Sequence, residues 1–146
     1  MAVQRILQEQ GQRVIMTRST DVFVPLSERS AISNRNNADM FVSIHRNAFN
    51  NPSANGVETF TRVNPPSAAL SAAQNVQNEL VRVGVQSNRG VKQANFSVLV
   101  NTRAPSILPE MGFITNARDN QLFDQNFDAY ATAIARRSIN VFRSTF

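Results

Sequence analysis

The order of hydrophobic and polar positions predicts helices and strands that alternate along the chain. Apolar residues recur at helical spacing over 1–12, 66–83 and about 127–142, and residues 26–36 are predicted to form a polar helix rich in Ser, Arg and Asn. Short apolar or alternating runs, which are typical of strands, occupy 13–17, 40–45, 56–61, 96–100 and part of 106–112. This alternation predicts an α/β fold, with a mostly parallel sheet covered by helices on both faces. No repeat or low-complexity linker interrupts the pattern, so we expect one domain over 1–146.

Composition narrows the class of protein and the kinds of partner. The 146 residues are 42% hydrophobic and contain no cysteine, which excludes disulfide bonds and leaves only nitrogen and oxygen ligands for a metal. No run approaches the roughly 20 apolar residues of a membrane span. The formal charge of +5 arises almost wholly from arginine and favours anionic partners such as nucleic acids or bacterial wall polymers. Because aromatic residues are not interleaved with the arginines, we do not expect nucleic-acid binding.

The first residues have the pattern of the interior of an amphipathic helix that ends near Gly11. Residues 1–12 lack the basic start and the long apolar core of a signal peptide. Because a helix entered without a capping residue is unusual, we expect the natural protein to extend further upstream.

Two residues that can carry chemistry stand at the ends of predicted strands. His45, the only histidine, follows the apolar run Phe41–Ile44, and Glu110 follows Ile107–Pro109. In a parallel sheet such ends open on the same edge, so the two side chains should converge, one as a metal ligand and the other as a general base. The alternatives are a loop histidine bonded to the backbone and a carboxylate paired with one of the arginines.

Several motifs together resemble one known family. They are, in chain order, Thr17–Asp21 (TRSTD), Asn36–Ala48 (NNADMFVSIHRNA), Gly56–Phe60 (GVETF), Arg89–Lys92 (RGVK), Phe96–Leu99 (FSVL) and Pro105–Asn116 (PSILPEMGFITN). Over essentially its whole length the chain is similar to the zinc-dependent N-acetylmuramoyl-L-alanine amidases, which include bacterial autolysins, cell-separation amidases and phage endolysins. The most specific motifs are Ser43–Ala48 and the segment around Glu110.

The resemblance implies a peptidoglycan hydrolase that cleaves the amide bond between N-acetylmuramic acid and L-alanine. In the family, two histidines and a glutamate hold zinc, and a further glutamate is the catalytic base. His45 matches the last histidine ligand and Glu110 matches the catalytic glutamate, whereas Asn47 can orient His45 or contact the substrate. The other two ligands belong to a glycine-rich turn and to the start of the first helix, and residues 1–146 contain neither.

The same resemblance implies a three-layer α/β/α, phosphorylase/hydrolase-like fold that lacks its first strand in this chain. The exposed strand edge would then favour a homo-oligomer. The implied partner is peptidoglycan, and the implied location is the wall or periplasm of an exporting cell, or delivery by a phage. Zinc binding and activity should be weak, because one histidine and one nearby carboxylate fall short of a catalytic zinc site. The alternative is a non-catalytic peptidoglycan-binding or regulatory module, although such a module would have no need for Glu110.

For the other charged residues we expect structural and not catalytic roles. We expect Glu58, in a predicted strand, to pair with an arginine rather than to bind a metal. We expect Arg18, Asp21 and Arg29 to form a salt-bridged scaffold rather than to contact substrate. Glu9 is expected on a solvated helix face, away from the metal.

Overall fold

The structure, a computed structural model, describes residues 1–143 as a succession of helices and strands. The helices are α1 (Ala2–Glu9), α2 (Leu26–Arg35), α3 (Ser67–Val83), α4 (Ser97–Val100), α5 (Ala117–Gln125) and α6 (Phe127–Arg143). The strands are β1 (Phe41–Val42), β2 (His45–Asn47), β3 (Val57–Thr61), β4 (Asn88–Gln93) and β5 (Ser106–Phe113).

The strands form one mixed sheet in the order β1-β5-β3-β4, with β2 also beside β5. β1 and β2 run parallel to β5, and β3 runs parallel to β4, whereas β3 and β5 are antiparallel. The predicted α/β fold with a mostly parallel sheet is therefore confirmed.

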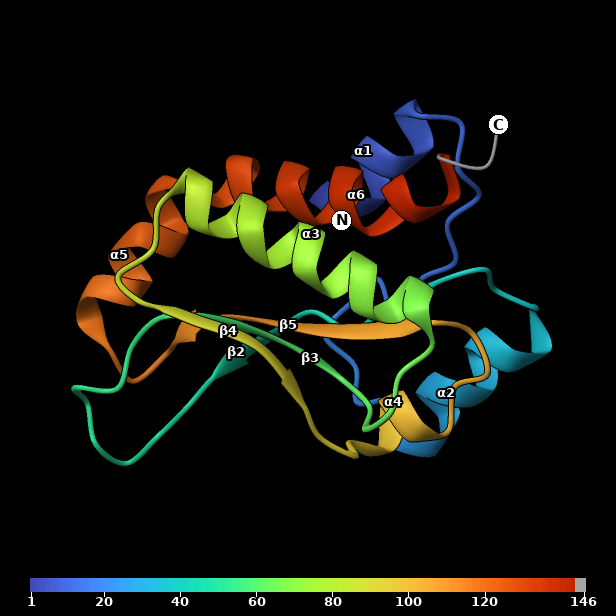
Figure 1. Ribbon diagram of the computed structural model, residues 1–146, viewed down its shortest axis with the longest axis horizontal. Coiled ribbons are helices and arrows are strands. Elements are labelled where there is room, and N and C mark those ends of the chain that lie inside the picture. Colours follow the sequence, from blue (N-terminus) through green and yellow to red (C-terminus); the bar gives the residue numbers. More distant parts are fainter. Residues whose placement is uncertain (144–146) are drawn as a thin grey trace.

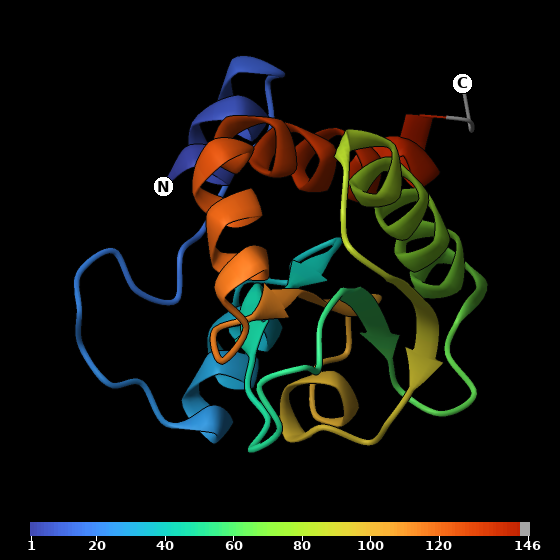
Figure 2. The ribbon, with the colours of Figure 1, turned by 90° about the vertical axis from the view of Figure 1, so that its left-hand side faces the viewer.

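Helices cover the two faces of the sheet unequally. α1, α3 and α6 lie over one face, whereas α2 and α4 lie on the other face near one end of the sheet (Figure 1). Figure 2 shows the same layers from the side, with the strands between the two groups of helices. Within residues 1–143, none of these helices combines the length and hydrophobicity that a membrane span requires.

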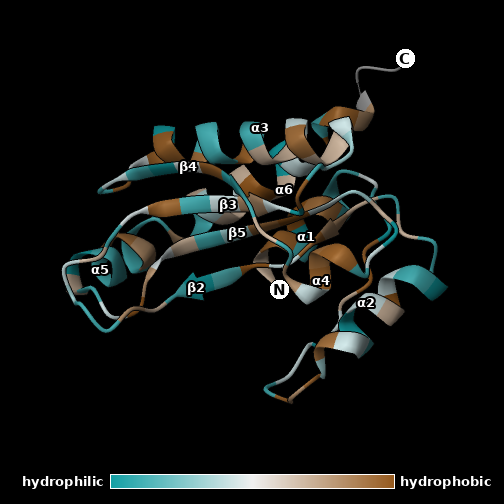
Figure 3. Ribbon diagram, turned by 60° about the horizontal axis from the view of Figure 1, so that its bottom comes forward, coloured by the Kyte–Doolittle hydropathy of each residue, from teal (hydrophilic) through white to brown (hydrophobic). Residues whose placement is uncertain are grey.

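The larger hydrophobic core lies between the sheet and the helices α3 and α6. Its buried members include Val76, Leu80, Ile107, Met111 and Ile134. α3 forms because its apolar residues recur every three or four positions, so that one side of the helix can pack against the sheet. By contrast, β2 is hydrophilic along its length (Figure 3).

A smaller core fills the space between α4 and the other face of the sheet. It contains Phe41, Val98, Leu99 and Leu108, with Phe60 packed against it. Because side chains alternate between faces along a strand, the residues two positions away from Leu108 and Phe60 point to this same face. These residues are Glu110 and Glu58. The face that α2 and α4 cover only in part therefore carries the carboxylates.

Two strand predictions require correction. Residues 13–17 form no strand, because no strand of residues 1–143 lies beside them to pair with their backbone, and Ile15 stays 43% exposed. The strand predicted at 40–45 is interrupted at Ser43 and Ile44. His45 nevertheless keeps the register of β1 against β5, and the register shifts by one residue only between His45 and Asn47.

The other differences concern short or polar segments. Residues 96–100, predicted as a strand, form the helical turn α4, in which the carbonyl of Phe96 accepts from the N–H groups of Leu99 and Val100. An apolar run of this length does not distinguish strand from helix. β4 and α5 were not predicted, because both are polar and show neither strand nor helix periodicity.

Candidate active site

His45, Glu110 and Glu58 form one row across the sheet. His45 is the register partner of Glu110 on the parallel pair β2 and β5, and Glu110 is the register partner of Glu58 on the antiparallel pair β5 and β3. Register partners on neighbouring strands have their side chains on the same face, with Cβ atoms about 5 Å apart. The structure therefore brings His45 and Glu110 together, as the sequence predicted.

Their positions within the strands differ from the prediction. Glu110 lies inside β5 and not at its end, and His45 begins β2 instead of standing where a strand gives way to a loop. The reason is that β5 continues to Phe113, because β2 pairs with its second half. The site therefore lies on a face of the sheet, beyond the part that α4 covers.

The carboxylate of Glu110 has an unusual environment. Its Oε2 atom is buried and has no hydrogen-bond partner, and within residues 1–143 the side chain forms no ion pair. Burial raises the pKa of Glu110 to about 7, and the negative charge of Glu58 contributes to the shift. The alternative interpretation, a carboxylate paired with arginine, is not what the structure shows. A carboxyl group with a pKa near neutrality can both accept and donate a proton at pH 7.

Glu58 has the arginine partner that the sequence predicted, and a lysine in addition. The side chain is 5% exposed, and its Oε2 atom lies 3.1 Å from Nε of Arg89 and 2.6 Å from Nζ of Lys92. Its Oε1 atom accepts a hydrogen bond from Nδ2 of Asn47. Glu58 is thus a buried carboxylate whose charge is compensated.

His45 lies next to Glu110 and is half-buried. Its Nε2 atom lies 2.8 Å from Oγ of Ser43, so its hydrogen bond is to a side chain and not to the backbone. Burial lowers the pKa of His45, and the positive charges of Arg29 and Arg18 lower it further. The imidazole is therefore neutral at pH 7, which is the form that binds a metal.

Asn47 connects β2 to β3 across β5. Its Nδ2 donates to Oε1 of Glu58 at 3.0 Å, and its Oδ1 accepts from the N–H of Ala48 at 3.0 Å. Both ends of the amide are engaged within the protein. The contact between Asn47 and substrate stays a prediction, and the observed bonds suit a residue that orients its neighbours.

The expected salt-bridged scaffold of Arg18, Asp21 and Arg29 is corrected by the structure. Nη1 of Arg18 donates to the carbonyl of Val22, and Nε of Arg29 donates to the carbonyl of Val24. No ion pair to Asp21 occurs within residues 1–143. These arginines hold an irregular segment by donating to its carbonyl groups. Those carbonyls are available because the segment pairs with no strand of residues 1–143.

Glu9 lies on an exposed helix face, as predicted, where it pairs with Arg5 at 2.9 Å.

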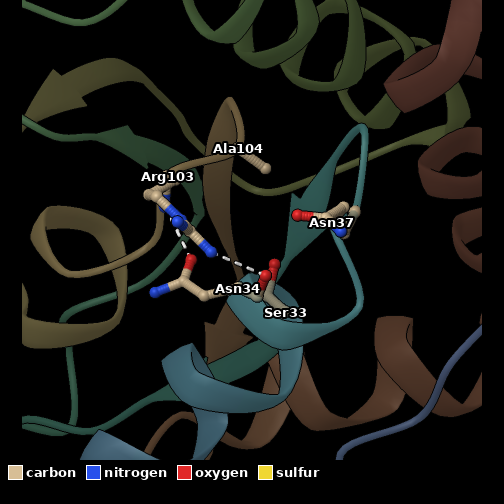
Figure 4. Close-up of a pocket in the computed structure, with 6 residues that line it drawn as sticks. Ser33, Asn34, Asn37, Arg103 and Ala104 are labelled. Atoms are coloured by element: carbon tan, nitrogen blue, oxygen red, sulfur yellow. Dashed lines mark hydrogen bonds between the residues drawn. The ribbon is translucent and has the colours of Figure 1, made fainter.

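A cavity of about 330 Å³ lies elsewhere, beside the C-terminal end of α2. Its lining includes Ser33, Asn37 and Ala104, and the carbonyl of Asn34 accepts from Nη2 of Arg103 (Figure 4). Ala104 lies six positions before Glu110, which corresponds to roughly 20 Å of extended chain. This cavity is separate from the row of His45, Glu110 and Glu58.

The residues of this row fit a zinc site only in part. His45 supplies a neutral imidazole, and Glu110 supplies a carboxylate oxygen without a partner. Catalytic zinc normally takes three protein ligands, and residues 1–143 contain no group of three His, Cys, Asp or Glu side chains that could hold a metal ion. These residues therefore do not form a complete zinc site.

Asp119 supports the site, although no role was assigned to it from the sequence. It is buried, and its Oδ2 accepts from the N–H groups of Gly56 and Phe113, both at 2.9 Å. It thereby ties the start of β3 to the end of β5. The N–H of Asp119 is bonded to Oδ1 of Asn116, which caps α5, and this Asn-x-x-Asp spacing was the signal in the sequence.

The chain matches several curated proteins over only part of their length. The chain is 40% identical over 114 residues to "Uncharacterized protein YqiI" of Bacillus subtilis (strain 168), covering 77% of this chain and 55% of that protein. It is 32% identical over 122 residues to "Probable cell wall amidase LytH" of Staphylococcus epidermidis (strain ATCC 12228 / FDA PCI 1200), covering 84% and 39%. The chain thus spans about half, or less, of the length of these relatives.

A solved structure and a family model both indicate the same family of enzymes. An N-acetylmuramoyl-L-alanine amidase from Clostridium difficile 630 superposes with a TM-score of 0.88 and 30% identity, covering 99% of this chain and 82% of that one. Residues 1–139 match the family model Amidase_3, described as N-acetylmuramoyl-L-alanine amidase. The chain therefore belongs to the N-acetylmuramoyl-L-alanine amidase family.

Proposed function

We propose that the protein hydrolyses the amide bond between N-acetylmuramic acid and L-alanine in peptidoglycan, with Glu110 as the general base. The observation that carries this proposal is the row of His45 and Glu110, in which a half-buried carboxylate has a free oxygen and a pKa near 7. The family membership of the chain supplies the class of reaction. In this proposal residues 1–146 form one catalytic domain.

Proton transfer by Glu110 is the chemistry that these residues support by themselves. The ionised carboxylate accepts a proton from a water molecule, which attacks the carbonyl carbon of the lactyl group. The C–N bond then breaks, and the protonated carboxyl returns the proton to the leaving amine of L-alanine. A pKa of about 7 suits both steps, because the two forms of the group are then present in similar amounts at neutral pH.

Zinc is the proposed cofactor, with His45 as one of its ligands. Residues 1–143 contain no group of three side chains that could hold a metal ion. The other zinc ligands would therefore have to come from outside these residues. This incomplete ligand set is also the observation that favours the second candidate function, a non-catalytic peptidoglycan-binding or regulatory module. Against that candidate stands Glu110, since a half-buried carboxylate whose buried oxygen has no partner is costly in a protein that does not use it.

Peptidoglycan is the proposed partner, and the proposed place of action is the wall or periplasm, after export or delivery by a phage. Named relatives are described as probable cell wall amidases, which supports this location. Self-association is a separate prediction. On their outer side, β1 and β2 pair with no strand of residues 1–143, and such an edge can pair with a second copy.

The proposed function is tested on purified peptidoglycan with zinc present, using both the 146-residue chain and the complete product of its gene. The measured products are new L-alanine amino termini and glycan with a free lactyl carboxylate. Glu110→Gln should lower the rate about 10²- to 10⁴-fold, the usual contribution of a general base. Arg82→Gln, which changes an exposed side chain on α3, is the matched control and should leave the rate unchanged. Binding of peptidoglycan by the gene product without release of either product would favour the binding module.

A further inference from the structure

A pair of cations lies on the open face of the sheet, next to the row of His45, Glu110 and Glu58. Arg89 and Lys92 come from the edge strand β4 and share the Oε2 atom of Glu58. Two positive side chains thus surround one carboxylate, which leaves the group of three with a formal net charge of +1. We call Arg89 and Lys92 the cationic pair.

The cationic pair has hydrogen-bond donors to spare. An ammonium group has three N–H donors and a guanidinium group has five. Within residues 1–143, Lys92 donates to Glu58, and Arg89 donates to Glu58 and to the carbonyl of Asn55. The two side chains are 42% and 35% exposed, whereas Glu58 is 5% exposed. Solvent and a ligand can therefore reach the cations but not the carboxylate that holds them.

The orientation of Arg89 is also restrained. Its guanidinium lies over the ring of Phe113, with 5.1 Å between Cζ and the ring centroid. The Nε bond to Glu58 holds the other side of the group. A planar guanidinium fixed in this way can present a pair of N–H groups to a carboxylate, which is the arrangement that arginine prefers.

The distance to Glu110 suits a peptide substrate. Glu110 pairs with Glu58, and Glu58 pairs with Gly90 on β4, so β4 lies two strand spacings from β5. That separation is about 9.5 Å. An extended peptide covers at most about 3.6 Å per residue, so two residues cover about 7 Å. The side chain of Arg89 covers the remainder, because its guanidinium lies over the ring of Phe113, which belongs to β5. When the amide of the first residue lies at Glu110, a group on the second residue can therefore reach the cationic pair.

We propose that Arg89 and Lys92 bind a free carboxylate on the second residue of the stem peptide, and that the enzyme thereby selects acidic over amidated peptides. This inference rests on the proposed function, because Glu110 defines where the scissile bond lies. A net charge of +1 with several free donors favours an anion over a neutral amide, and it disfavours a cation. Glu58 is the residue that positions the two cations, and it does not contact the ligand.

Binding to the 146-residue chain is measured by titration calorimetry with two N-acetylmuramoyl dipeptides. Both carry L-alanine first, and they differ only in a free carboxylate or a carboxamide on the second residue. The acid should bind on the order of ten-fold more tightly, as expected for hydrogen bonds to a charged group. In the double variant Arg89→Gln/Lys92→Gln the two ligands should bind equally. Lys92→Arg keeps the charge and should keep the preference, and Arg82→Gln on the opposite face is the control for loss of charge.

The outcomes separate this inference from the proposed function. Equal binding of the two dipeptides by the unchanged protein, or a preference that survives in the double variant, would overturn the role of the cationic pair and leave peptidoglycan recognition intact. Binding of neither dipeptide would overturn both. Circular dichroism shows whether the double variant is folded, and a single variant, Lys92→Gln, retains the Arg89 to Glu58 bond and should lose part of the preference.

Discussion

Glu58 and Glu110 are register partners on the antiparallel strands β3 and β5, yet their carboxylates have opposite surroundings. Glu58 receives hydrogen bonds from Asn47, Arg89 and Lys92. The Oε2 atom of Glu110 is buried without a partner, and burial together with the charge of Glu58 raises the pKa of Glu110 to about 7. Neighbouring carboxylates in different environments can take different roles. One of them stabilises the sheet, and the other is suited to proton transfer.

The raised pKa of Glu110 predicts how stability depends on pH. Between the ordinary pKa of 4.5 and about 7, the folded protein holds a proton on Glu110 that the unfolded chain has lost. The contribution of this group to the free energy of unfolding is therefore full below pH 4.5 and falls as the pH rises to 7. Because solvent screens a half-buried group, we expect a loss of about 1–2 kcal/mol. Urea denaturation at a series of pH values measures it, and Glu110→Gln should remove this part of the pH dependence. An identical profile in the variant would contradict the assignment.

The rate of amide hydrolysis should also follow the ionisation of Glu110. A general base must be ionised to accept a proton, so the rate should fall as the pH drops below about 7. The measurement is the pH dependence of the release of L-alanine amino termini by the complete gene product. A rate that stays constant down to pH 5 would show that Glu110 is not the base.

Replacing Glu58 by Gln should affect both stability and the neighbouring carboxyl. Loss of its charge leaves Arg89 and Lys92 without an anion, and removal of one partner from a buried ion pair is destabilising. We expect a cost of about 1–3 kcal/mol, because the two cations are partly exposed.

The same substitution should lower the pKa of Glu110, since the charge of Glu58 helps to raise it. NMR titration of Glu110 and chemical denaturation measure the two effects. Glu9→Gln, on an exposed ion pair, is the control and should change stability by less than about 0.5 kcal/mol.

Asp119→Ala should destabilise the ends of β3 and β5. The substitution leaves the N–H groups of Gly56 and Phe113 without their acceptor in a buried place. Each buried donor that loses its partner costs about 1–3 kcal/mol. Thermal or chemical unfolding measures the change, and Asp124→Ala on the exposed side of α5 is the matched control. A loss no larger than that of Asp124→Ala would show that Asp119 does not hold the two strand ends together.

Zinc binding by the 146-residue chain should be weak and should depend on His45. One neutral imidazole and one nearby carboxylate provide fewer ligands than catalytic zinc normally takes. Calorimetric titration with zinc should give no tight stoichiometric site, and His45→Ala should remove the residual binding. Tight binding by a dialysed monomer would mean that another residue of the chain completes the site.

Local pattern was sufficient to predict the long helices and most of the sheet. α3 and α6 were predicted because a helix of their length needs a continuous apolar side to pack, and that side is visible as spacing in the sequence. β3 and β5 were predicted for the corresponding reason, since their buried residues form apolar or alternating runs. The same signal is missing from β4 and α5, which are polar, and it is ambiguous for the short apolar segment that became α4.

The site shows the same division. His45 and Glu110 were singled out from their places after apolar runs, and the arginine partner of Glu58 was expected because a buried carboxylate requires one. The free oxygen of Glu110, the lysine beside Glu58 and the position of the row on one face of the sheet depend on which strands pair and in which register. Register is decided by contacts between residues that are far apart in the chain, such as Asn47 with Glu58 or Asp119 with Gly56. Spacing along a sequence records periodicity within one element, and it contains no direct record of such contacts between elements.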